Sequence, residues 1–399
     1  MHYMEIGGAE ISLIGMLQAI DFSKYTVDLF IHSHQGELMQ FIPKEVNILP
    51  EIKSYAHIEK PMKEALTHGC WGVLYGRLKA KWLIYKYMHK EGIQDSEAGL
   101  QYVANCVSPF LPSLYKYGEY DLAISYLTPH NYVLEKVHAK KKICWIHTDY
   151  TRIDINTAIE LPIWRKYDHI MSISPDVTKT FLQVFPSLDD KIIEMENILS
   201  PSFVRSRAEE FNAKKELNNE ANDSLILLSI GRFSYPKNFD NIPDICRRLI
   251  THLSSDNSQL KIKWFIIGYG GDEQLIRKRI IENGMNENII ILGKKTNPYP
   301  YIKACDIYVQ PSRYEGKSVT VREAQMLHRP VVVTDYPTAK SQIQDGIDGK
   351  IVPLENEACA IGIAEFITNT NLQEKIKINL QNHDFGNEKE IEKLYQLIP

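Results

Sequence analysis

Short apolar runs alternate with longer amphipathic segments along this chain, and this alternation constrains the fold more than any other feature. Four runs occupy the first half, at 25–31, 121–127, 142–148 and 169–174, and five occupy the second, at 224–231, 261–268, 288–293, 306–312 and 330–335. Near-continuous apolar strands separated by helices are typical of parallel sheets covered on both faces. The sequence therefore predicts an α/β fold with two Rossmann-like, doubly wound domains that face each other across a cleft.

A polar stretch at 195–224 separates the two groups of strands. We place a boundary there and expect one domain at 1–198 and a second at 199–385. Residues 386–399 are expected to form a helix, and packing back on the N-terminal domain is one arrangement for it. Only six residues precede Gly7, so we expect the first strand of the N-terminal domain to be incomplete, which leaves open whether the true start lies upstream.

The composition narrows the function classes. The 399 residues carry a net charge of −4, which argues against a dedicated nucleic-acid-binding protein. The six cysteines form no C-x-x-C pair, so neither a zinc site nor a disulfide framework is indicated, and a reduced cytosol fits best. We find no signal peptide, and no apolar run reaches the ~18 residues that a membrane-spanning helix needs.

Two cations follow the first strand of the second domain, in "SIGRFSYPKN". Arg232 and Lys237 come just after Gly231, in an expected strand-to-helix loop. An arginine fork and a lysine point charge at the carboxyl end of a strand are suited to one diphosphate. A solvated turn explains these residues equally well.

Gly7 and Gly8 precede a predicted helix at 9–20. Glycines at such a point let the backbone approach a ligand, and the amino end of a helix favours an anion. A simple tight turn accounts for the pair equally well.

The stretch "PSRYEGKSVTVREAQ" holds two glutamates, Glu315 and Glu323, with seven residues between them. We expect Glu315 at the apex of an exposed loop and Glu323 inside a helix that starts near Ser318. The amides of Gly316, Lys317 and Ser318 would then point into the cleft. A carboxylate near a helix start commonly complements the helix dipole, and Ser318 fits an ordinary N-cap. Neither interpretation accounts for Glu315.

Taken in order, these stretches resemble the retaining GT-B glycosyltransferases, specifically glycosyltransferase family 4 (glycosyl transferases group 1). The resemblance covers nearly the whole chain and is strongest from about 224 to 355. It rests on the two glutamates, on the loop with Arg232 and Lys237, and on "IIGYGGDEQLI", "ILGKK", "ACDIYVQPS" and "DGIDGKIV". A single pair of glutamates at this spacing is common, whereas the ordered set, with each member at a strand end, is specific.

The resemblance implies that the second domain binds a nucleotide diphosphate sugar as donor. Glu323 would hold the ribose hydroxyls, and Glu315 would contact the sugar near its reacting face. Arg232 and Lys237 would neutralise the leaving diphosphate. In "WIHTDY" the resemblance also matches a strand-end histidine, so His147 is expected to face the donor sugar. The other donor-binding residues that it implies are Gly7, Gly8, Gly231, Gly268, Gly293, Lys294, Gly316, Lys317 and Ser318.

The expected chemistry needs positive charge from the protein. Glycosyl transfer builds negative charge on the departing diphosphate, and fixed cations stabilise it in a site that excludes water. The sequence contains no Asp-x-Asp motif of the kind that carries a metal-bound diphosphate in the other main glycosyltransferase fold. We therefore expect no metal and no other cofactor. Lys317 stands where the family often has an aromatic residue, which leaves the identity of the sugar open.

The segment 65–90 of the N-terminal, acceptor-side domain carries basic residues and no acidic one. Its lysines and arginine are Arg77, Lys79, Lys81, Lys86 and Lys90, and its apolar residues at helical spacing are Trp71, Leu74, Leu78, Trp82 and Tyr85. Such a stripe is most often core, with the lysines as a solvated face. A basic helix lying on an anionic membrane is the other interpretation, and a lipid-linked acceptor would follow from it.

We therefore expect a cytoplasmic glycosyltransferase, with contact to the inner face of the membrane left open, that acts in bacterial surface polysaccharide synthesis. Its acceptor would be a saccharide or a glycolipid. A nucleotide-sugar 2-epimerase, which would form product without an acceptor, and a non-catalytic binding protein of the same fold remain alternatives. His130 follows another strand end and is either an acceptor-side residue or a plain loop histidine. The nucleotide base, the sugar, the linkage and the oligomeric state stay open.

Overall fold

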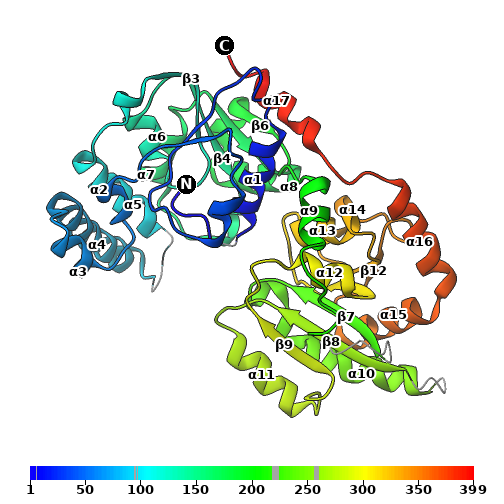
Figure 1. Cartoon of the computed structure of the whole chain (residues 1–399). Helices are drawn as coiled ribbons and strands as arrows, with labels where there is room; N and C mark the ends of the chain where they lie inside the picture. The colour runs from blue at the N-terminus through cyan, green and yellow to red at the C-terminus, as the bar shows by residue number, and fades with distance from the viewer. Residues whose placement is uncertain (6, 94–95, 97, 218–223, 256–259) are drawn as a thin grey trace. The chain divides into compact units, whose positions relative to one another are not determined.

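The computed structural model describes residues 1–5, 7–93, 96, 98–217, 224–255 and 260–399, and it divides into two compact units (Figure 1). The N-terminal unit comprises Met1–Leu199 with Asn387–Pro399, and the C-terminal unit comprises Ser200–Gly386. The sequence prediction placed these boundaries after residues 198 and 385. All strand pairs within the described ranges are parallel, so the predicted α/β class with parallel sheets is confirmed.

The C-terminal unit is built on one six-stranded sheet in the order β12-β11-β10-β7-β8-β9. Its strands are β7 (Ser224–Ile230), β8 (Lys261–Ile267), β9 (Ile289–Gly293), β10 (Ile307–Gln310), β11 (Val331–Thr334) and β12 (Lys350–Val352). Its helices are α9 (Pro201–Ala208), α10 (Ile242–Ser255), α11 (Glu273–Glu282), α12 (Tyr299–Ala304), α13 (Val319–Met326), α14 (Ala339–Gln342), α15 (Asn356–Thr368) and α16 (Thr370–Asn382). The five apolar runs predicted as strands are all strands, and β12 is an additional one.

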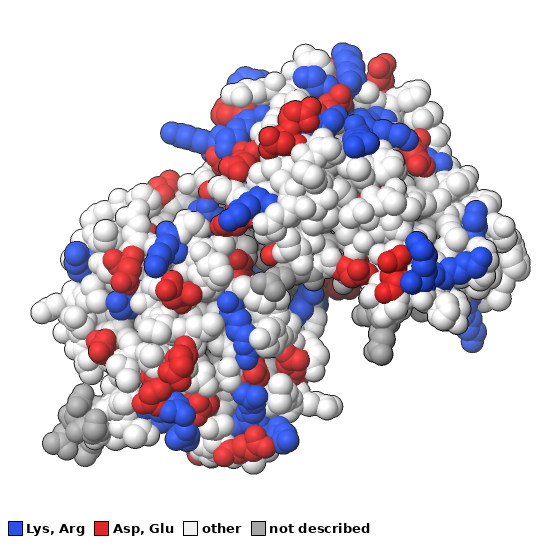
Figure 2. All heavy atoms as spheres, turned by 180° about the vertical axis from the view of Figure 1, so that it is seen from behind, with Lys and Arg blue, Asp and Glu red and all other residues white. Residues whose placement is uncertain are grey.

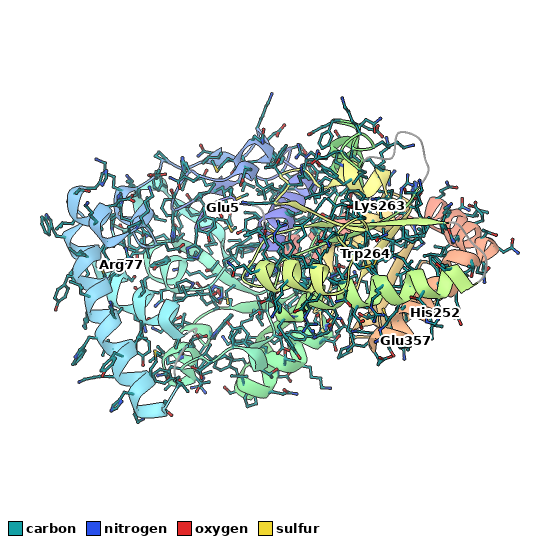
Figure 3. The ribbon with its side chains drawn as sticks, turned by 90° about the horizontal axis from the view of Figure 1, so that it is seen from below. Glu5, Arg77, His252, Lys263, Trp264 and Glu357 are labelled. Carbon is teal, nitrogen blue, oxygen red and sulfur yellow. The ribbon has the colours of Figure 1, made fainter. Side chains whose placement is uncertain are left out.

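Buried polar groups inside this sheet are hydrogen-bonded across strands. Trp264 of β8, labelled in Figure 3, is fully buried and donates from Nε1 to Oγ of Ser229 at 2.9 Å. Ser229 in turn donates to the carbonyl oxygen of Val309 at 2.6 Å. On the helical layer, His252 of α10 lies 2.7 Å from a carboxylate oxygen of Glu357 of α15 (Figure 3). The hydrogen bonds within the sheet offset the cost of burying Trp264 and Ser229, so they help to fix the register of β7, β8 and β10.

The sheet of the N-terminal unit is in two parts, one with the order β1-β2 and one with the order β3-β4-β5-β6. The strands are β1 (Asp28–Leu29), β2 (Asn47–Ile48), β3 (Glu119–Ser125), β4 (His138–Ile146), β5 (His169–Ser172) and β6 (Ile192–Glu194). The helices are α1 (Gly8–Ala19), α2 (Lys53–Ala56), α3 (Met62–Thr67), α4 (Trp71–Glu91), α5 (Ala98–Val107), α6 (Asn131–Lys136), α7 (Thr157–Trp164), α8 (Pro175–Val184) and α17 (Ile391–Tyr395). The short strands β2 and β6 were not predicted from the sequence.

The first residues of the chain run beside the segment that follows β1. The amide of His32 donates to the carbonyl of Met1, and that of Ser33 donates to the carbonyl of His2, both at 2.9 Å. No strand is assigned to the described residues before α1. A cavity of about 420 Å³, lined by residues 24–30 and 119–127 among others, lies between β1 and β3. The two parts of the sheet are therefore separated at the place where the first strand of a doubly wound domain was expected.

The last helix of the chain, α17, packs on the N-terminal unit. The hydroxyl of Tyr395 accepts a hydrogen bond from the amide of Asp21 at 2.7 Å, and its ring stacks on Tyr25 with 4.5 Å between the ring centres. Lys393 donates to the carbonyl of Glu194 at 3.0 Å. Leu394 is 4% exposed, so this helix completes the apolar core of the unit, which is the arrangement considered from the sequence.

The segment 65–90 forms the end of α3 and most of α4, and its aromatic residues are exposed. Trp71, Trp82 and Tyr85 are 63%, 54% and 70% exposed. The interpretation of this stripe as core is therefore wrong, because α4 packs through its small residues instead. Within the described ranges, no helix has both the length and the apolar character that crossing a membrane requires.

Replacing Leu394 by alanine should lower the free energy of unfolding of the N-terminal unit by about 2–4 kcal/mol, since it leaves a cavity under α17. Urea denaturation followed by tryptophan fluorescence measures this change. The control is Leu100→Ala on α5, where Leu100 is 49% exposed and we expect a change within about 0.5 kcal/mol. Equal effects of the two substitutions would contradict the docking of α17.

Candidate functional site

The strand order of the C-terminal sheet reverses between β7 and β10. From β7 the chain continues to β8 and β9 on one side, whereas β10, β11 and β12 lie on the other. Loops that leave two adjacent strands in opposite directions open a crevice at the carboxyl ends, where ligands of open α/β sheets bind. The loop after β7 carries Arg232 and Lys237, and the loop after β10 carries Glu315.

Lys237 and Glu315 form an ion pair at this reversal point. The Nζ atom of Lys237 lies 2.5 Å from Oε1 of Glu315, and the two side chains are 24% and 10% exposed. Oε1 also accepts hydrogen bonds from Oγ of Ser312 at 2.6 Å and from Nε2 of Gln310 at 3.1 Å. The sequence prediction of an exposed loop apex for Glu315 is thus corrected: three donors hold its carboxylate in a largely enclosed position. Oε2 accepts no hydrogen bond from the described residues.

Sequence reasoning missed the residues that orient Glu315. Gln310 is fully buried at the end of β10. Its Nε2 donates to Ser312 at 2.7 Å as well as to Glu315, and its Oε1 accepts from the hydroxyl of Tyr308 at 2.6 Å. A glutamine within an apolar strand was the available signal, because a buried amide is costly unless its hydrogen bonds are made.

Arg232, the other predicted cation, is exposed and forms no ion pair or side-chain hydrogen bond within the described part of the chain. Lys237 differs, because it is paired and its stem lies close to Gly231. A Cβ placed on Gly231 would be 3.4 Å from Cδ and Cε of Lys237. The loop therefore offers one cation that is already ordered and one that is open to an anion.

The two glycines at the carboxyl ends of β8 and β9 differ in their surroundings. A Cβ on Gly268 would lie 1.9 Å from the carbonyl oxygen of Gly231, so close packing of the loops after β7 and β8 already requires glycine there. Gly293 ends β9 with φ +71°, and the space around its Cβ position is open. Lys294 follows as an exposed residue whose ammonium lies 5.3 Å from the ring centre of Tyr269.

The amide of Ser318 is already engaged. It donates to Oε1 of Gln342 at 3.0 Å, and Nε2 of Gln342 donates back to the carbonyl of Ser318 at 2.5 Å. This pairing corrects the prediction of an amide open to a ligand at Ser318. Ser318 is the N-cap residue of α13, but its hydroxyl makes no capping hydrogen bond. Gly316 is exposed and Lys317 is half-buried, and their roles stay predictions.

Glu323 lies inside α13 and is 3% exposed. Its Oε1 accepts a hydrogen bond from the hydroxyl of Tyr299 at 2.8 Å. Burial raises the pKa of Glu323 to about 7, because desolvation disfavours the ionised form. Tyr299, on α12, was not predicted, since no local pattern links it to a glutamate in another helix.

His147 follows β4 in the N-terminal unit, as predicted. Its Nε2 donates to the carbonyl oxygen of Tyr126 at 2.9 Å, and burial lowers the pKa of His147 to about 4. The ring is therefore neutral near pH 7. Because a carbonyl only accepts, the hydrogen is on Nε2 and the lone pair is on Nδ1. His147 is thus equipped to accept a hydrogen bond from a hydroxyl.

Gly7 is the N-cap residue of α1, and Gly8 is its first residue. A Cβ on Gly7 would lie 2.2 Å from Oε2 of Glu10, whereas no atom lies within 4 Å of that position on Gly8. Burial raises the pKa of Glu10. A carboxyl group of the chain itself therefore lies at the amino end of α1, where the sequence predicted an anionic ligand.

His130 is neither exposed nor a plain loop residue. It is 3% exposed, its Nδ1 lies 2.8 Å from Oγ of Ser125, and its ring centre lies 4.5 Å from that of Trp164. All six cysteines are free. Within the described ranges there is no group of three or more His, Cys, Asp or Glu side chains placed to bind a metal ion.

Replacing Glu323 by glutamine should flatten the dependence of stability on pH. The raised folded-state pKa of about 7, against the usual 4.5, means that Glu323 contributes stability that is fully present below pH 4.5 and is lost as the pH rises through about 7. The loss is on the order of 3 kcal/mol. Urea denaturation at a series of pH values measures it, with the 64% exposed Glu374 as the matched site for a control Glu→Gln change. If the free energy of unfolding depends on pH in the same way for wild type and E323Q, then folding does not raise the pKa of Glu323, and the prediction is contradicted.

Comparison with known proteins agrees with this architecture. Residues 210–383 match the model of the family glycosyl transferases group 1. The poly(ribitol-phosphate) alpha-N-acetylglucosaminyltransferase of Staphylococcus aureus is 27% identical over 41% of this chain and 31% of its own length. The N-acetylgalactosamine-N,N'-diacetylbacillosaminyl-diphospho-undecaprenol 4-alpha-N-acetylgalactosaminyltransferase of Campylobacter jejuni is 29% identical over 36% of this chain and 37% of its own length. The chain thus spans well under half of these curated relatives.

The fold is also shared with solved structures. The crystal structure of Anabaena HepE in complex with UDP-glucose has a TM-score of 0.66 with this chain, at 14% identity, and the match covers 99% of this chain and 98% of HepE. At this identity the likeness shows the fold, which is the two-unit α/β fold of GT-B glycosyltransferases. Nearly all of the C-terminal unit, residues 210–383, thus matches the model of the family glycosyl transferases group 1, and the chain as a whole has the GT-B fold.

Proposed function

We propose that the chain is a retaining glycosyltransferase that moves a sugar from a nucleotide diphosphate sugar to a saccharide or glycolipid acceptor, without a metal ion or other cofactor. The observation that carries this proposal is the Lys237–Glu315 ion pair at the strand reversal of a group 1 domain. A cation and a carboxylate at this point match the two charges that separate during glycosyl transfer, negative on the diphosphate and positive on the sugar.

In this proposal Arg232 and Lys237 bind the diphosphate. Arg232 is exposed and unpaired among the described residues, so a phosphate gains its guanidinium without breaking an existing ion pair. Lys237 is positioned by Glu315 and Gly231, so its ammonium is ordered before the donor binds. Charge that is positioned in advance costs no reorganisation as the leaving group departs.

Glu315 and Glu323 contact the sugar and the ribose in this proposal. Oε1 of Glu315 is held by three donors, which leaves Oε2 to accept a hydrogen bond from a sugar hydroxyl. Glu323 accepts one hydrogen bond, from Tyr299, and retains acceptor capacity for ribose hydroxyls. Hydroxyl donors would favour its ionised form and lower its pKa from about 7.

The remaining assignments extend this scheme. Gly293 and Lys294 lie against the base, and the amides of Gly316 and Lys317 contact the sugar or the phosphate. His147 accepts a hydrogen bond from a sugar hydroxyl through Nδ1, because Nε2 is already used. Gly8 leaves room for the ligand, whereas the carboxyl group of Glu10 occupies the space beside Gly7. Retention follows the resemblance to family 4, in which the leaving phosphate helps to deprotonate the acceptor.

The names of the relatives support a cytoplasmic role in bacterial surface polysaccharide synthesis. The Staphylococcus aureus relative is named for poly(ribitol-phosphate), and the Campylobacter jejuni relative for a diphospho-undecaprenol glycolipid. We propose an acceptor of the same chemical class for this chain, which is either a polymer or a lipid-linked saccharide.

A thermal-shift panel of UDP, GDP, ADP, CMP and dTDP should give stabilisation by one nucleotide, because ligand binding to the folded state raises its stability. A ligand at about 100 times its Kd adds about 2.7 kcal/mol. Arg232→Ala should abolish the shift without lowering the Tm of the free protein, since Arg232 is exposed and its side chain has no hydrogen bond or ion pair to lose among the described residues.

The matched control is Arg277→Ala on α11, where the side chain is 56% exposed and lies outside the proposed site. This variant should keep the full shift. No shift with any nucleotide, or an undiminished shift in Arg232→Ala, would contradict the proposed donor site.

Sugar transfer should persist in excess EDTA, because Arg232 and Lys237 supply the charge that neutralises the diphosphate. Product formation from the nucleotide sugar identified by the panel, with and without EDTA, measures this. Abolition of transfer by EDTA and its recovery with added Mg²⁺ would contradict metal independence. A modified sugar nucleotide that forms without any acceptor would contradict transfer itself.

A further inference from the structure

Helix α4 exposes five of its large apolar residues, whereas the residues that it buries are small. Val73, Gly76 and Ala80 are its buried residues. Five large residues on the other side form what we call the aromatic face: Trp71 (63% exposed), Tyr75 (60%), Leu78 (52%), Trp82 (54%) and Tyr85 (70%). A surface helix ordinarily turns its large apolar residues toward the core, so this arrangement is the reverse of the usual one.

The buried side of α4 is sufficient to hold the helix in the N-terminal unit. A Cβ on Gly76 would lie 2.7 Å from the carbonyl oxygen of Cys106, and one on Gly72 would lie 2.7 Å from Cβ of Phe110. Arg77, labelled in Figure 3, turns to the backbone and donates to the carbonyls of His57, at 3.2 Å, and of Lys60. The aromatic face is therefore not needed to fix α4 in place.

The aromatic face is one continuous stripe. Its residues follow one another at intervals of four, three, four and three positions, which places them on one side of a helix with 3.6 residues per turn. The stripe is about 20 Å long at a rise of about 1.5 Å per residue. Phe110, 46% exposed, extends it sideways, since its ring centre lies 5.7 Å from that of Tyr75 in an edge-to-face contact.

Lysines flank the stripe on both sides. At about 100° per residue, Lys79, Lys86 and Lys90 lie on one flank and Lys81 on the other, and all four are exposed. Nζ of Lys86 lies 3.7 Å from the ring centre of Trp82. No acidic residue occurs from 71 to 90. On the face drawn in Figure 2, Lys and Arg are interspersed with Asp and Glu.

We propose that the aromatic face of α4 binds the surface of an anionic lipid bilayer, with the helix in the plane of the interface. Tryptophan and tyrosine prefer the interfacial region, and lysines beside them reach back to lipid phosphates. The lysines favour an anionic bilayer over a second copy of the chain as the binding partner, because two such faces would bring like-charged lysine flanks together. This inference goes beyond the proposed function and does not depend on it.

Tryptophan fluorescence tests the orientation. The chain has five tryptophans, and Trp145, Trp164 and Trp264 are at most 2% exposed, so only Trp71 and Trp82 can move into lipid. Vesicles of phosphatidylcholine with phosphatidylglycerol should shift the emission to shorter wavelength, whereas vesicles of phosphatidylcholine alone should not. The double variant W71F/W82F should still sediment with anionic vesicles but show no shift. Sedimentation of the wild type without a shift would overturn the proposal.

Charge neutralisation tests the lipid chemistry. K79Q/K81Q/K86Q should weaken binding to anionic vesicles on the order of a hundredfold, at about fivefold per lysine. The control K24Q/K278Q/K340Q removes the same charge from side chains that are 70%, 71% and 78% exposed elsewhere, and it should bind like the wild type within about fivefold. An equal loss in both triple variants would overturn the proposal. So would sedimentation velocity that shows a dimer dissociated by Trp82→Ser, because the face would then bind a second copy.

Discussion

The ion pair between Lys237 and Glu315 is the interaction on which the candidate site depends. It joins residues 78 positions apart in the sequence and connects the loops after β7 and β10, where the strand order reverses. Its low exposure means that removing either partner would leave the other charge poorly solvated, which is costly. The pair therefore orders a cation and a carboxylate at the sheet edge before any ligand is present, and it leaves Arg232 and the second oxygen of Glu315 available to one.

The neighbouring uncharged residues support this arrangement through hydrogen bonds and close backbone packing. Gln310 and Ser312 fix the carboxylate from the end of β10, and the contact between Gly231 and Gly268 sets the path of the loop that carries Lys237. Glu323 differs from Glu315, because its buried carboxyl group destabilises the fold when it ionises. Groups held at such a cost are typical of functional sites.

Much of the fold could be predicted from apolar periodicity, since all nine runs became strands and only the two- or three-residue strands β2, β6 and β12 were missed. Such short strands are defined by pairing rather than by a pattern. In the site, the positions of Lys237 and Glu315 followed from strand ends. The hydrogen-bond partners of Ser318 and Glu323 could not be predicted, because Gln342 and Tyr299 come from other segments. For α4, a stripe of aromatic residues fits a core or a surface equally well, and only the small residues opposite it decide between them.

The most direct test of the proposed donor site is a crystal structure of the protein with the nucleotide diphosphate that stabilises it in the thermal-shift panel. We expect phosphate oxygens within hydrogen-bond distance of Lys237 and Arg232 and ribose hydroxyls at Glu323, beside the carboxyl ends of β7 and β10. A nucleotide bound away from this strand reversal, with the Lys237–Glu315 pair untouched, would contradict the proposed donor site.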